Sequence, residues 1–274
     1  MKKLYCVVAG MLVVLGLSFL PPATYGLAPQ EILEKAAEAK GGRKLLDSIK
    51  DVIITERWGG RYRFIQYYKA PDKSRSERWK DDVLSKVLGY NGKIRWQHGG
   101  GGLADAEYEK NQLEDWNLIY RLWIEKPEKL GYLGIEEVEG RDAFGIILSE
   151  SRTMAQGYLT IESKKFFFDG QSFLLVKMEQ KGEDRFPQYG AGRFTRSFFF
   201  SDYRRVDGIL TAHKRRLVFR PKKGKGGSNV QTMQVRYNMG LEDSFFESPG
   251  MGILGTSWLG SWAHRYVEGG VPQK

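Results

Sequence analysis

The chain has 274 residues, of which 41% are hydrophobic and 28% are charged, and its formal net charge is +10. This length is enough for one sizeable hydrophobic core or two small ones, which is typical of a globular protein. The single cysteine, Cys6, lies close to the N-terminus, so the remainder of the chain has no disulfide and no thiol chemistry.

Residues 1–28 have the layout of a secretory signal peptide. Lys2 and Lys3 precede an apolar run from Leu4 to Leu20, and a Pro21-Pro22 pair and small residues follow. Cleavage after Gly26 or after Ala28 fits this pattern, and an uncleaved N-terminal anchor is the alternative. We expect a cleaved signal and a mature protein in the periplasm or cell envelope.

The mature chain is strongly basic. Removing Lys2 and Lys3 from the 43 basic residues leaves 41 against 33 acidic ones, a net charge of about +8. In an exported protein this excess favours contact with lipid headgroups and envelope polysaccharides rather than with nucleic acid.

Residues 30–49 predict an interrupted amphipathic helix. Ile32, Leu33, Ala36 and Ala37 recur at helical spacing, and the Gly41-Gly42 pair breaks the pattern. A second short apolar turn follows at residues 45–49.

After residue 51 the hydrophobic period shortens to two, which predicts β-strands. Eleven strands are expected, at 52–58, 61–69, 75–80, 83–90, 93–97, 143–149, 158–168, 172–180, 196–206, 209–219 and 229–238. The dipeptides Asn91-Gly92, Asp169-Gly170 and Asp207-Gly208 separate neighbouring segments, and such pairs favour tight hairpin turns. The pattern predicts an antiparallel meander that curls on itself.

The middle of the chain departs from the strand pattern. Four glycines at 99–102 are followed by Trp116, Tyr120 and Trp123 at helical intervals. We interpret this as a flexible loop followed by an aromatic-faced helix over about 105–126, ending near Pro127.

Two later segments are irregular. Residues 220–229 form a basic hairpin loop that carries Arg220, Lys222, Lys223 and Lys225, and these four are expected to dock anionic headgroups. Residues 249–274 are a glycine-rich tail with Trp258 and Trp262.

The usual signatures of catalytic and metal sites are missing from the sequence. The histidines His98, His213 and His264 have no second ligand at metal-binding spacing, so no metal site is predicted. The glycine clusters lack the Gly-Lys-Ser/Thr ending of a phosphate loop, and GTSWLG at 255–260 is not a nucleophile elbow.

Carboxylates on predicted strands leave one enzymatic alternative open. Glu77, Glu179 and Asp202 could cleave glycosides if two of them stood about 5 to 9.5 Å apart. Solvated pairing with nearby Arg and Lys is the simpler interpretation. We therefore predict no enzyme, no catalytic residue and no cofactor.

The chain is rich in aromatic residues, with 7 Trp, 14 Tyr and 15 Phe. Most of these rings are expected in a core. In the run 198–200, Phe198 and Phe200 face one side of a strand and Phe199 the other, so one apolar face could pack on helices while the other lines a cavity for a lipid. The expected cavity-lining residues are Trp58, Tyr62, Phe64, Trp96, Phe168, Phe198 and Phe200.

Several segments together resemble the LolA/LolB-like family of periplasmic lipoprotein carriers. They are YYKAPDKSRSE (67–77), VLGYNGKIRWQ (87–97), FFFDGQSFLLVKMEQ (166–180) and DYRRVDGILTAHKRRLVF (202–219). The positions that match the family pattern are Lys69, Pro71, Asn91, Gly92, Lys93 and Trp96. The family places an arginine before the proline to latch its helical lid, whereas Ala70 stands here, and Lys69 or Arg75 could substitute for it.

The resemblance covers about residues 30–248 and implies the fold class and the domains. The implied fold is α+β, a strongly curved, incomplete antiparallel β-barrel of about 11 strands with helices covering the open side. Residues 29–248 would form the lipid-binding domain, with Trp116, Tyr120 and Trp123 on a lid helix. Residues 249–274 would form a separate tail.

The same resemblance implies a carrier that binds the acyl chains of a lipid or lipoprotein in an apolar cavity and transfers them towards the outer membrane. Its partners would be a lipid or lipid-modified protein and a membrane-associated donor or acceptor, with no nucleic acid, and the protein would act as a monomer. The alternative is a non-enzymatic envelope sensor, regulator or interaction module with the same fold, in which Trp258 and Trp262 would contact the partner.

Overall fold

A computed structural model describes residues 27–99, 127–149, 152–154, 159–184, 192–222 and 224–248. The expected signal peptide, the expected lid helix with Trp116, Tyr120 and Trp123, and the tail with Trp258 and Trp262 lie outside these residues. Within the described ranges, no helix is long and apolar enough to cross a lipid bilayer.

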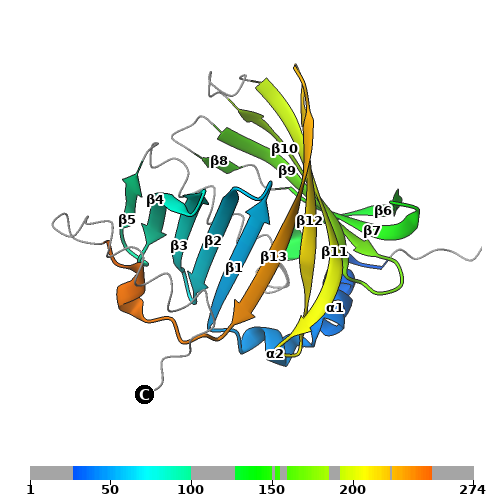
Figure 1. Ribbon diagram of the computed structural model, residues 1–274. Helices are drawn as coiled ribbons and strands as arrows, with labels where there is room; N and C mark the ends of the chain where they lie inside the picture. The colour runs from blue at the N-terminus through cyan, green and yellow to red at the C-terminus, as the bar shows by residue number, and fades with distance from the viewer. Residues whose placement is uncertain are drawn as a thin grey trace, which may run out of the picture.

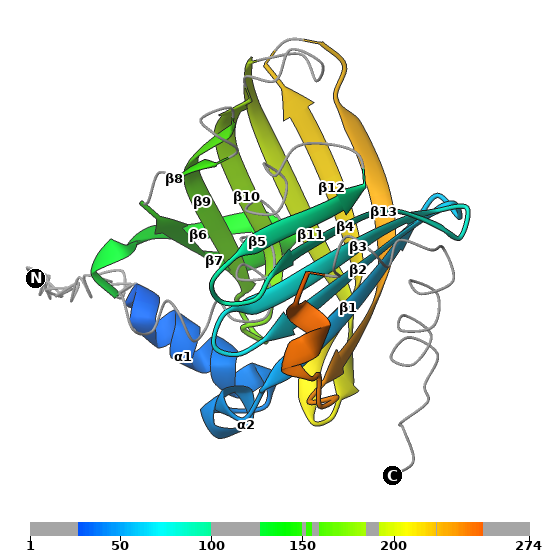
Figure 2. The same cartoon turned by 90° about the vertical axis from the view of Figure 1, so that its left-hand side faces the viewer.

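The described chain is dominated by one antiparallel sheet that curves strongly without closing (Figures 1 and 2). Its strands follow the order β5-β4-β3-β2-β1-β13-β12-β11-β10-β9-β7-β6, and β8 pairs with β9 beside this path. They are β1 (Asp51–Trp58), β2 (Tyr62–Lys69), β3 (Lys73–Lys80), β4 (Val83–Tyr90), β5 (Arg95–Gly99), β6 (Leu130–Val138), β7 (Arg141–Leu148), β8 (Arg152–Met154), β9 (Leu159–Asp169), β10 (Leu175–Asp184), β11 (Gly192–Val206), β12 (Ile209–Pro221) and β13 (Gly227–Tyr237).

The sheet has thirteen strands in the described residues, two more than expected. The additional strands are β6 and β8. β6 contains Gly131 and Gly134, which weaken a strand signal, and it forms because β7 provides an antiparallel partner with a register shift near Gly134. β8 has three residues, which is too short for a periodic pattern.

The expected interrupted helix is confirmed. It consists of α1 (Pro29–Lys40) and α2 (Arg43–Asp47). Gly41 ends α1 with a φ of 139°, and a Cβ atom there would lie 2.9 Å from the carbonyl oxygen of Gly208. Glycine is therefore required both by the backbone conformation and by the close approach of the β11–β12 turn.

Each face of the sheet has its own hydrophobic core, and α1 and α2 lie at one end of the inner face (Figures 1 and 2). Ile32, Leu33, Ala36 and Ala37 of α1 pack there against strands from both halves of the sheet. On the outer face of β1–β5 lie residues 238–248, which we call the strap and which include the short 3-10 helix η4 (Asp243–Phe246).

Candidate functional site

The inner face carries one continuous, buried apolar surface against which α1 packs. Phe166, Phe168, Phe198 and Phe200 are each 5% exposed or less and belong to the same core cluster as the apolar side of α1. The other members from the strands are Val52, Ile54, Tyr68, Ile146, Leu148, Leu175, Met178, Ile209, Ala212, Met233, Val235 and Tyr237. Three expected lining residues, Phe168, Phe198 and Phe200, thus lie together on this surface.

Three more expected lining residues lie on the inner face but farther from α1. Trp58 is opposite Tyr62 in the β1–β2 register, and Phe64 is opposite Glu56. Directly opposed residues share one face of a sheet, so all three project to the side of Ile54. The rings of Trp58 and Tyr62 lie 6.0 Å apart, and Tyr62 is 41% exposed, which places this pair at the rim.

Trp96 does not belong to this set, contrary to expectation. It pairs with Gly89, which pairs with Arg75, and Arg75 pairs with Tyr67 of the outer-face cluster. Its indole Nε1 donates a hydrogen bond of 2.8 Å to the carbonyl oxygen of Phe246 in the strap. Trp96 is therefore part of the outer face.

A band of buried polar side chains crosses the inner face next to the apolar surface, and we call it the polar belt. Each member is 5% exposed or less, and each comes from a different strand. The belt consists of Ser76, Gln66, Glu56, Gln231, Arg215, Lys86, Gln180 and Lys164.

An ion pair lies at the centre of the belt. Arg215 Nη2 donates to Glu56 Oε2 at 2.6 Å, and Arg215 Nε donates to Gln231 Oε1 at 2.5 Å. The guanidinium carbon also lies 5.3 Å from the ring centroid of Phe198. Burial raises the pKa of Glu56, and the positive charge of Arg215 opposes that rise.

Sequence reasoning missed this belt. Alternating polar residues in a strand usually indicate a solvent-facing side, whereas these residues occupy the same side of their strands as the buried apolar ones. A usable signal was the change from apolar to polar residues along one face of a strand. In β13, for example, Tyr237, Val235 and Met233 are followed at the same spacing by Gln231.

Three of the residues that match the family pattern, Lys69, Asn91 and Trp96, contact the strap on the outer face. Lys69 and Lys73 contact Asp243 at 2.5 and 2.7 Å. Asn91 Nδ2 donates to Glu247 Oε2 at 2.7 Å.

The β4–β5 turn brings Asn91 to that position. Asn91 Oδ1 accepts hydrogen bonds from the backbone N–H groups of Lys93 and Ile94, and Gly92 has a φ of 94°. The expected Asn-Gly turn is therefore present. Pro71 follows a cis peptide bond, and its carbonyl oxygen accepts a hydrogen bond from Tyr68.

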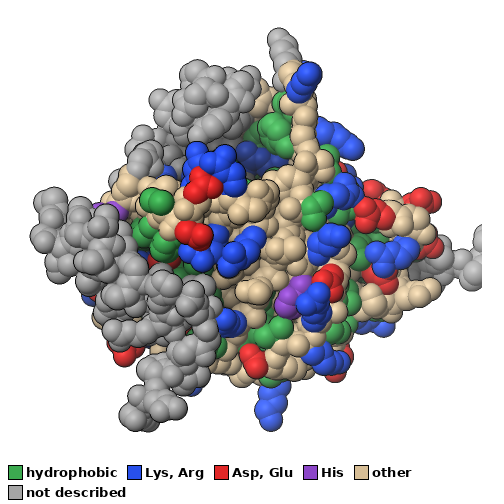
Figure 3. Space-filling view, viewed as in Figure 1, with side chains coloured by type: hydrophobic (Ala, Val, Ile, Leu, Met, Phe, Trp, Pro, Cys, Tyr) green, Lys and Arg blue, Asp and Glu red, His purple; other side chains and the backbone are tan. Residues whose placement is uncertain are grey.

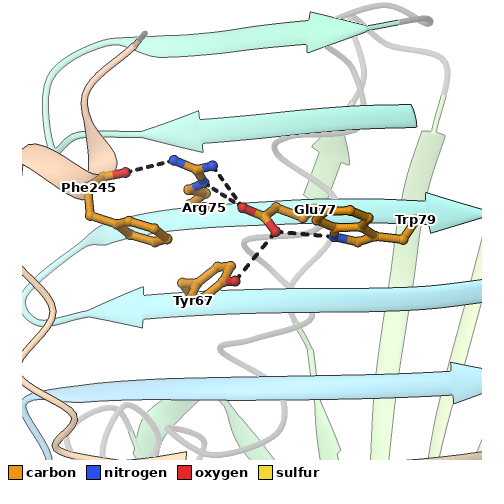
Figure 4. A network of polar contacts seen from close by, with 5 residues as sticks. All are labelled: Tyr67, Arg75, Glu77, Trp79 and Phe245. Atoms are coloured by element: carbon orange, nitrogen blue, oxygen red, sulfur yellow. Dashed lines mark hydrogen bonds and ion pairs between the residues drawn. The ribbon is translucent and has the colours of Figure 1, made fainter. Parts of the chain in front are cut away.

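A buried network beneath the strap fixes the outer face (Figure 4). Glu77 Oε1 accepts two hydrogen bonds from Arg75, while its Oε2 accepts from Tyr67 and Trp79. Arg75 Nη1 also donates to the carbonyl oxygen of Phe245 at 3.2 Å. Lys69 and Arg75, considered above as substitutes for the missing lid arginine, thus both contact the strap.

Glu77, Glu179 and Asp202, the carboxylates considered for glycoside cleavage, lie on three different strands. Glu77 is paired with Arg75, Glu179 lies near Lys177 and Lys181, and Asp202 pairs with Arg204. Among the described side chains, no group of three or more His, Cys, Asp or Glu residues could hold a metal ion.

The basic loop lies at the tip of the long β12–β13 hairpin, at the end of the sheet away from α1 and α2 (Figure 1). Arg220, Lys222 and Lys225 are exposed, while the side chain of Lys223 lies outside the described residues. Figure 3 shows Lys and Arg at this tip and on the strands below it. The exposure of these basic residues and their position at the hairpin tip suit contact with an anionic surface.

No protein-family model matches the chain, and a search of curated proteins finds no match. Among solved structures, a DUF1329 family protein from Desulfovibrio piger matches at 16% identity with a TM-score of 0.45, over 81% of this chain and 98% of that one. A domain named for outer membrane lipoprotein sorting, from Vibrio parahaemolyticus, matches at 16% identity and a TM-score of 0.44, over 78% and 95%.

A LolA superfamily protein from Nitrosomonas europaea matches at 12% identity and a TM-score of 0.44, over 81% of this chain and 99% of that one. Structures of the family that the sequence motifs resemble are thus among the matches. At these identities and TM-scores the likeness gives neither a ligand nor an activity.

Proposed function

We propose that this protein is a non-catalytic carrier of the cell envelope that holds acyl chains of a lipid or lipoprotein against the inner face of its sheet and delivers them towards the outer membrane. The observation that carries the proposal is the continuous apolar cluster that lies between α1 and the inner side of an unclosed sheet. A sheet that closed on itself would seal that side, whereas here β5 and β6 end the strand path without pairing with each other.

The hydrophobic effect sets the scale of such binding. Burying one methylene group contributes about 0.8 kcal/mol, so a chain of about fifteen gains roughly 12 kcal/mol on leaving water. Phe168 and Phe200 carry large apolar side chains without polar atoms, and both are buried in this cluster. A site of this kind holds hydrocarbon without requiring a specific headgroup contact.

Delivery requires a membrane-facing surface, which we assign to the basic tip of the β12–β13 hairpin. Each basic side chain near an anionic bilayer contributes about 1 kcal/mol. Arg220, Lys222 and Lys225 are exposed there, in the part of the β12–β13 hairpin that extends past the end of β1. In this proposal they bring the carrier to anionic headgroups.

The carrier function is tested with a fluorescent acyl probe added to delipidated, refolded full-length protein. We expect saturable binding with a stoichiometry near one. Phe200→Trp places a larger ring on the inner face and should weaken binding by about tenfold, because overpacking removes space for the chain. Phe199→Trp is the matched control, since Phe199 lies on the outer face. Absence of saturable acyl binding in the unmodified protein would overturn the proposal.

A second candidate function is an interaction module that presents its C-terminal tail to a membrane partner. The strap favours it, because Arg75 and Trp96 hold main-chain carbonyl groups of Phe245 and Phe246 much as a peptide ligand is held. The strap leads directly into residues 249–274.

Deleting residues 249–274 separates the two functions. If the tail recruits the partner, the deletion abolishes partner capture from solubilised envelope and leaves binding of the acyl probe unchanged. Loss of acyl binding with intact partner capture would instead support the carrier.

A further inference from the structure

The inner face of β1–β4 ends in a row of four side chains, which we call the rim row. Its members are Trp58, Tyr62, Lys80 and Val83, and each lies directly opposite the next in the strand register. Directly opposed residues share one face of a sheet, so the row forms one strip at the strand ends. Within it, Lys80 Nζ lies 5.9 Å from the ring centroid of Tyr62. The strip combines aromatic, aliphatic and basic side chains.

The rim row leaves large apolar side chains open to solvent. Val83 is 67% exposed and Tyr62 is 41% exposed. Single exposed apolar residues are common on protein surfaces, whereas these two lie on neighbouring hairpins on either side of Lys80. Packing within the fold does not account for this exposure, so the row is available for contact with another surface.

Two turns hold the rim row in place. Asp81 and Asp82 have φ values of 50° and 59°, the left-handed pair that a two-residue hairpin turn requires, and this turn sets Lys80 opposite Val83. Arg61 of the β1–β2 turn donates two hydrogen bonds to Asp81, at 2.8 and 2.6 Å. The two turns lie side by side at the right of Figure 2. The row is therefore presented on two hairpin ends that are joined to each other.

The composition of the row matches the region between lipid headgroups and hydrocarbon. Trp and Tyr are enriched at that interface because their rings have an apolar body and a polar tip, and a lysine can extend its ammonium group to the headgroups. The carboxylates of the neighbouring turn have basic partners, Asp81 with Arg61 and Asp82 with Arg63. Lys80 and the formal net charge of +10 favour an anionic leaflet.

We propose that the rim row is a membrane-contact site that inserts into the interfacial region of an anionic bilayer. Tyr62 and Val83 enter between the headgroups, and Lys80 contacts their phosphate groups. The basic tip of the β12–β13 hairpin attracts the bilayer by charge, whereas the rim row adds apolar insertion. This inference rests on the membrane step of the proposed function and is independent of acyl binding.

A polarity-sensitive label compares two apolar positions of nearly equal exposure. Val83 begins β4, whereas Ile94, which is 65% exposed, lies in the β4–β5 turn at the opposite end of that strand. Val83→Cys and Ile94→Cys are made separately in the exported protein with Cys6→Ser, so that each protein carries one nitrobenzoxadiazole label. Vesicles of phosphatidylethanolamine and phosphatidylglycerol are then added. We expect the fluorescence at position 83 to rise about twofold or more and to shift to the blue, because the label leaves water, and that at position 94 to stay unchanged.

A double substitution measures the contribution of the row to vesicle binding. Tyr62→Ser/Val83→Ser should weaken binding by about tenfold, because two apolar side chains no longer enter the bilayer. Ile94→Ser is the matched control, since it removes an equally exposed apolar side chain at the other end of β4. It should bind the vesicles as the wild type does.

The outcomes separate the rim row from the carrier function. An unchanged label at position 83, or an equal change at positions 83 and 94, overturns the membrane-contact site. Unaltered vesicle binding by the double variant, with its fold checked by circular dichroism, also overturns it. The fluorescent acyl probe is titrated into the same labelled proteins, and a failure to bind it overturns the carrier function alone.

Discussion

Gly89 and Trp96 show how a single small residue decides where a ring lies on one face of the sheet. A Cβ atom at Gly89 would lie 2.2 Å from two atoms of the Trp96 indole, so the ring lies flat on the glycine backbone. In this position the indole N–H reaches the carbonyl oxygen of Phe246. The small residue on β4 therefore provides the place where the strap is anchored.

Gly89→Ala should destabilise the protein by about 1 to 3 kcal/mol, the usual range for overpacking a filled site. The added methyl group would displace Trp96 and weaken its hydrogen bond to the strap. Urea unfolding followed by tryptophan fluorescence measures the change. Gly227→Ala is the control, because no atom lies within 4 Å of a Cβ there, and its effect should stay within about 0.5 kcal/mol. Equal stability of the two variants would contradict this account of Gly89.

At the level of elements, the strap acts as a covering segment for the outer face of β1–β5. Asp51 accepts hydrogen bonds from the backbone N–H groups of Met239, Gly240 and Leu241, which fixes the start of the strap. Phe245 and Phe246 are buried against Tyr67 and Ile65 in the outer core. Without the strap, these apolar residues of the sheet would face water.

The contacts of Asp243 make the strap sensitive to acid. Hydrogen bonds from Lys69, then from Lys73, lower the pKa of Asp243 from 3.8 to about 2. A carboxylate with a lowered pKa in the folded state stabilises it above pH 4, and this contribution is lost as the pH falls from about 4 to 2. We therefore expect the wild-type protein to lose stability in this window.

Asp243→Asn tests this contribution. Its free energy of unfolding, measured in urea between pH 2 and 7, should be below that of the wild type above pH 4, and the two should converge near pH 2. Asp82→Asn is the control, because Asp82 is 87% exposed and lies 3.7 Å from Arg63; it should follow the wild-type curve. A constant difference between the Asp243→Asn variant and the wild type at all pH values would show that the carboxylate charge is not the cause.

At the scale of the whole molecule, strand pairing brings distant parts of the chain together. Glu56 and Arg215 are separated by 159 positions and by the intervening strand β13, yet they form a 2.6 Å ion pair on the inner face. The outer face is completed in a similar way, because Arg75 and Phe245 meet across 170 positions. Both candidate surfaces therefore depend on the pairing of β1 with β13.

Local patterns in the sequence predicted many of the elements correctly. The break at Gly41-Gly42, the Asn91-Gly92 turn and the Asp207-Gly208 turn are all present, and Asp207 and Gly208 have φ values of 49° and 83°. These features depend on residues close in sequence, so short windows contain the necessary information. β6 was missed because its stability comes from pairing with β7.

The sequence by itself determined where most of the strands fall and that Phe198 and Phe200 share a face opposite to Phe199, since the two-residue period of a strand is a local property. Only the tertiary structure decided which of those faces is the inner one, that Trp96 lies beneath the strap, and that polar residues of eight strands form one buried belt. The physical reason is that the alternation of side chains defines the two sides of a strand but does not show which side faces the interior. That assignment comes from curvature and from the segments, α1 and the strap, that cover each side.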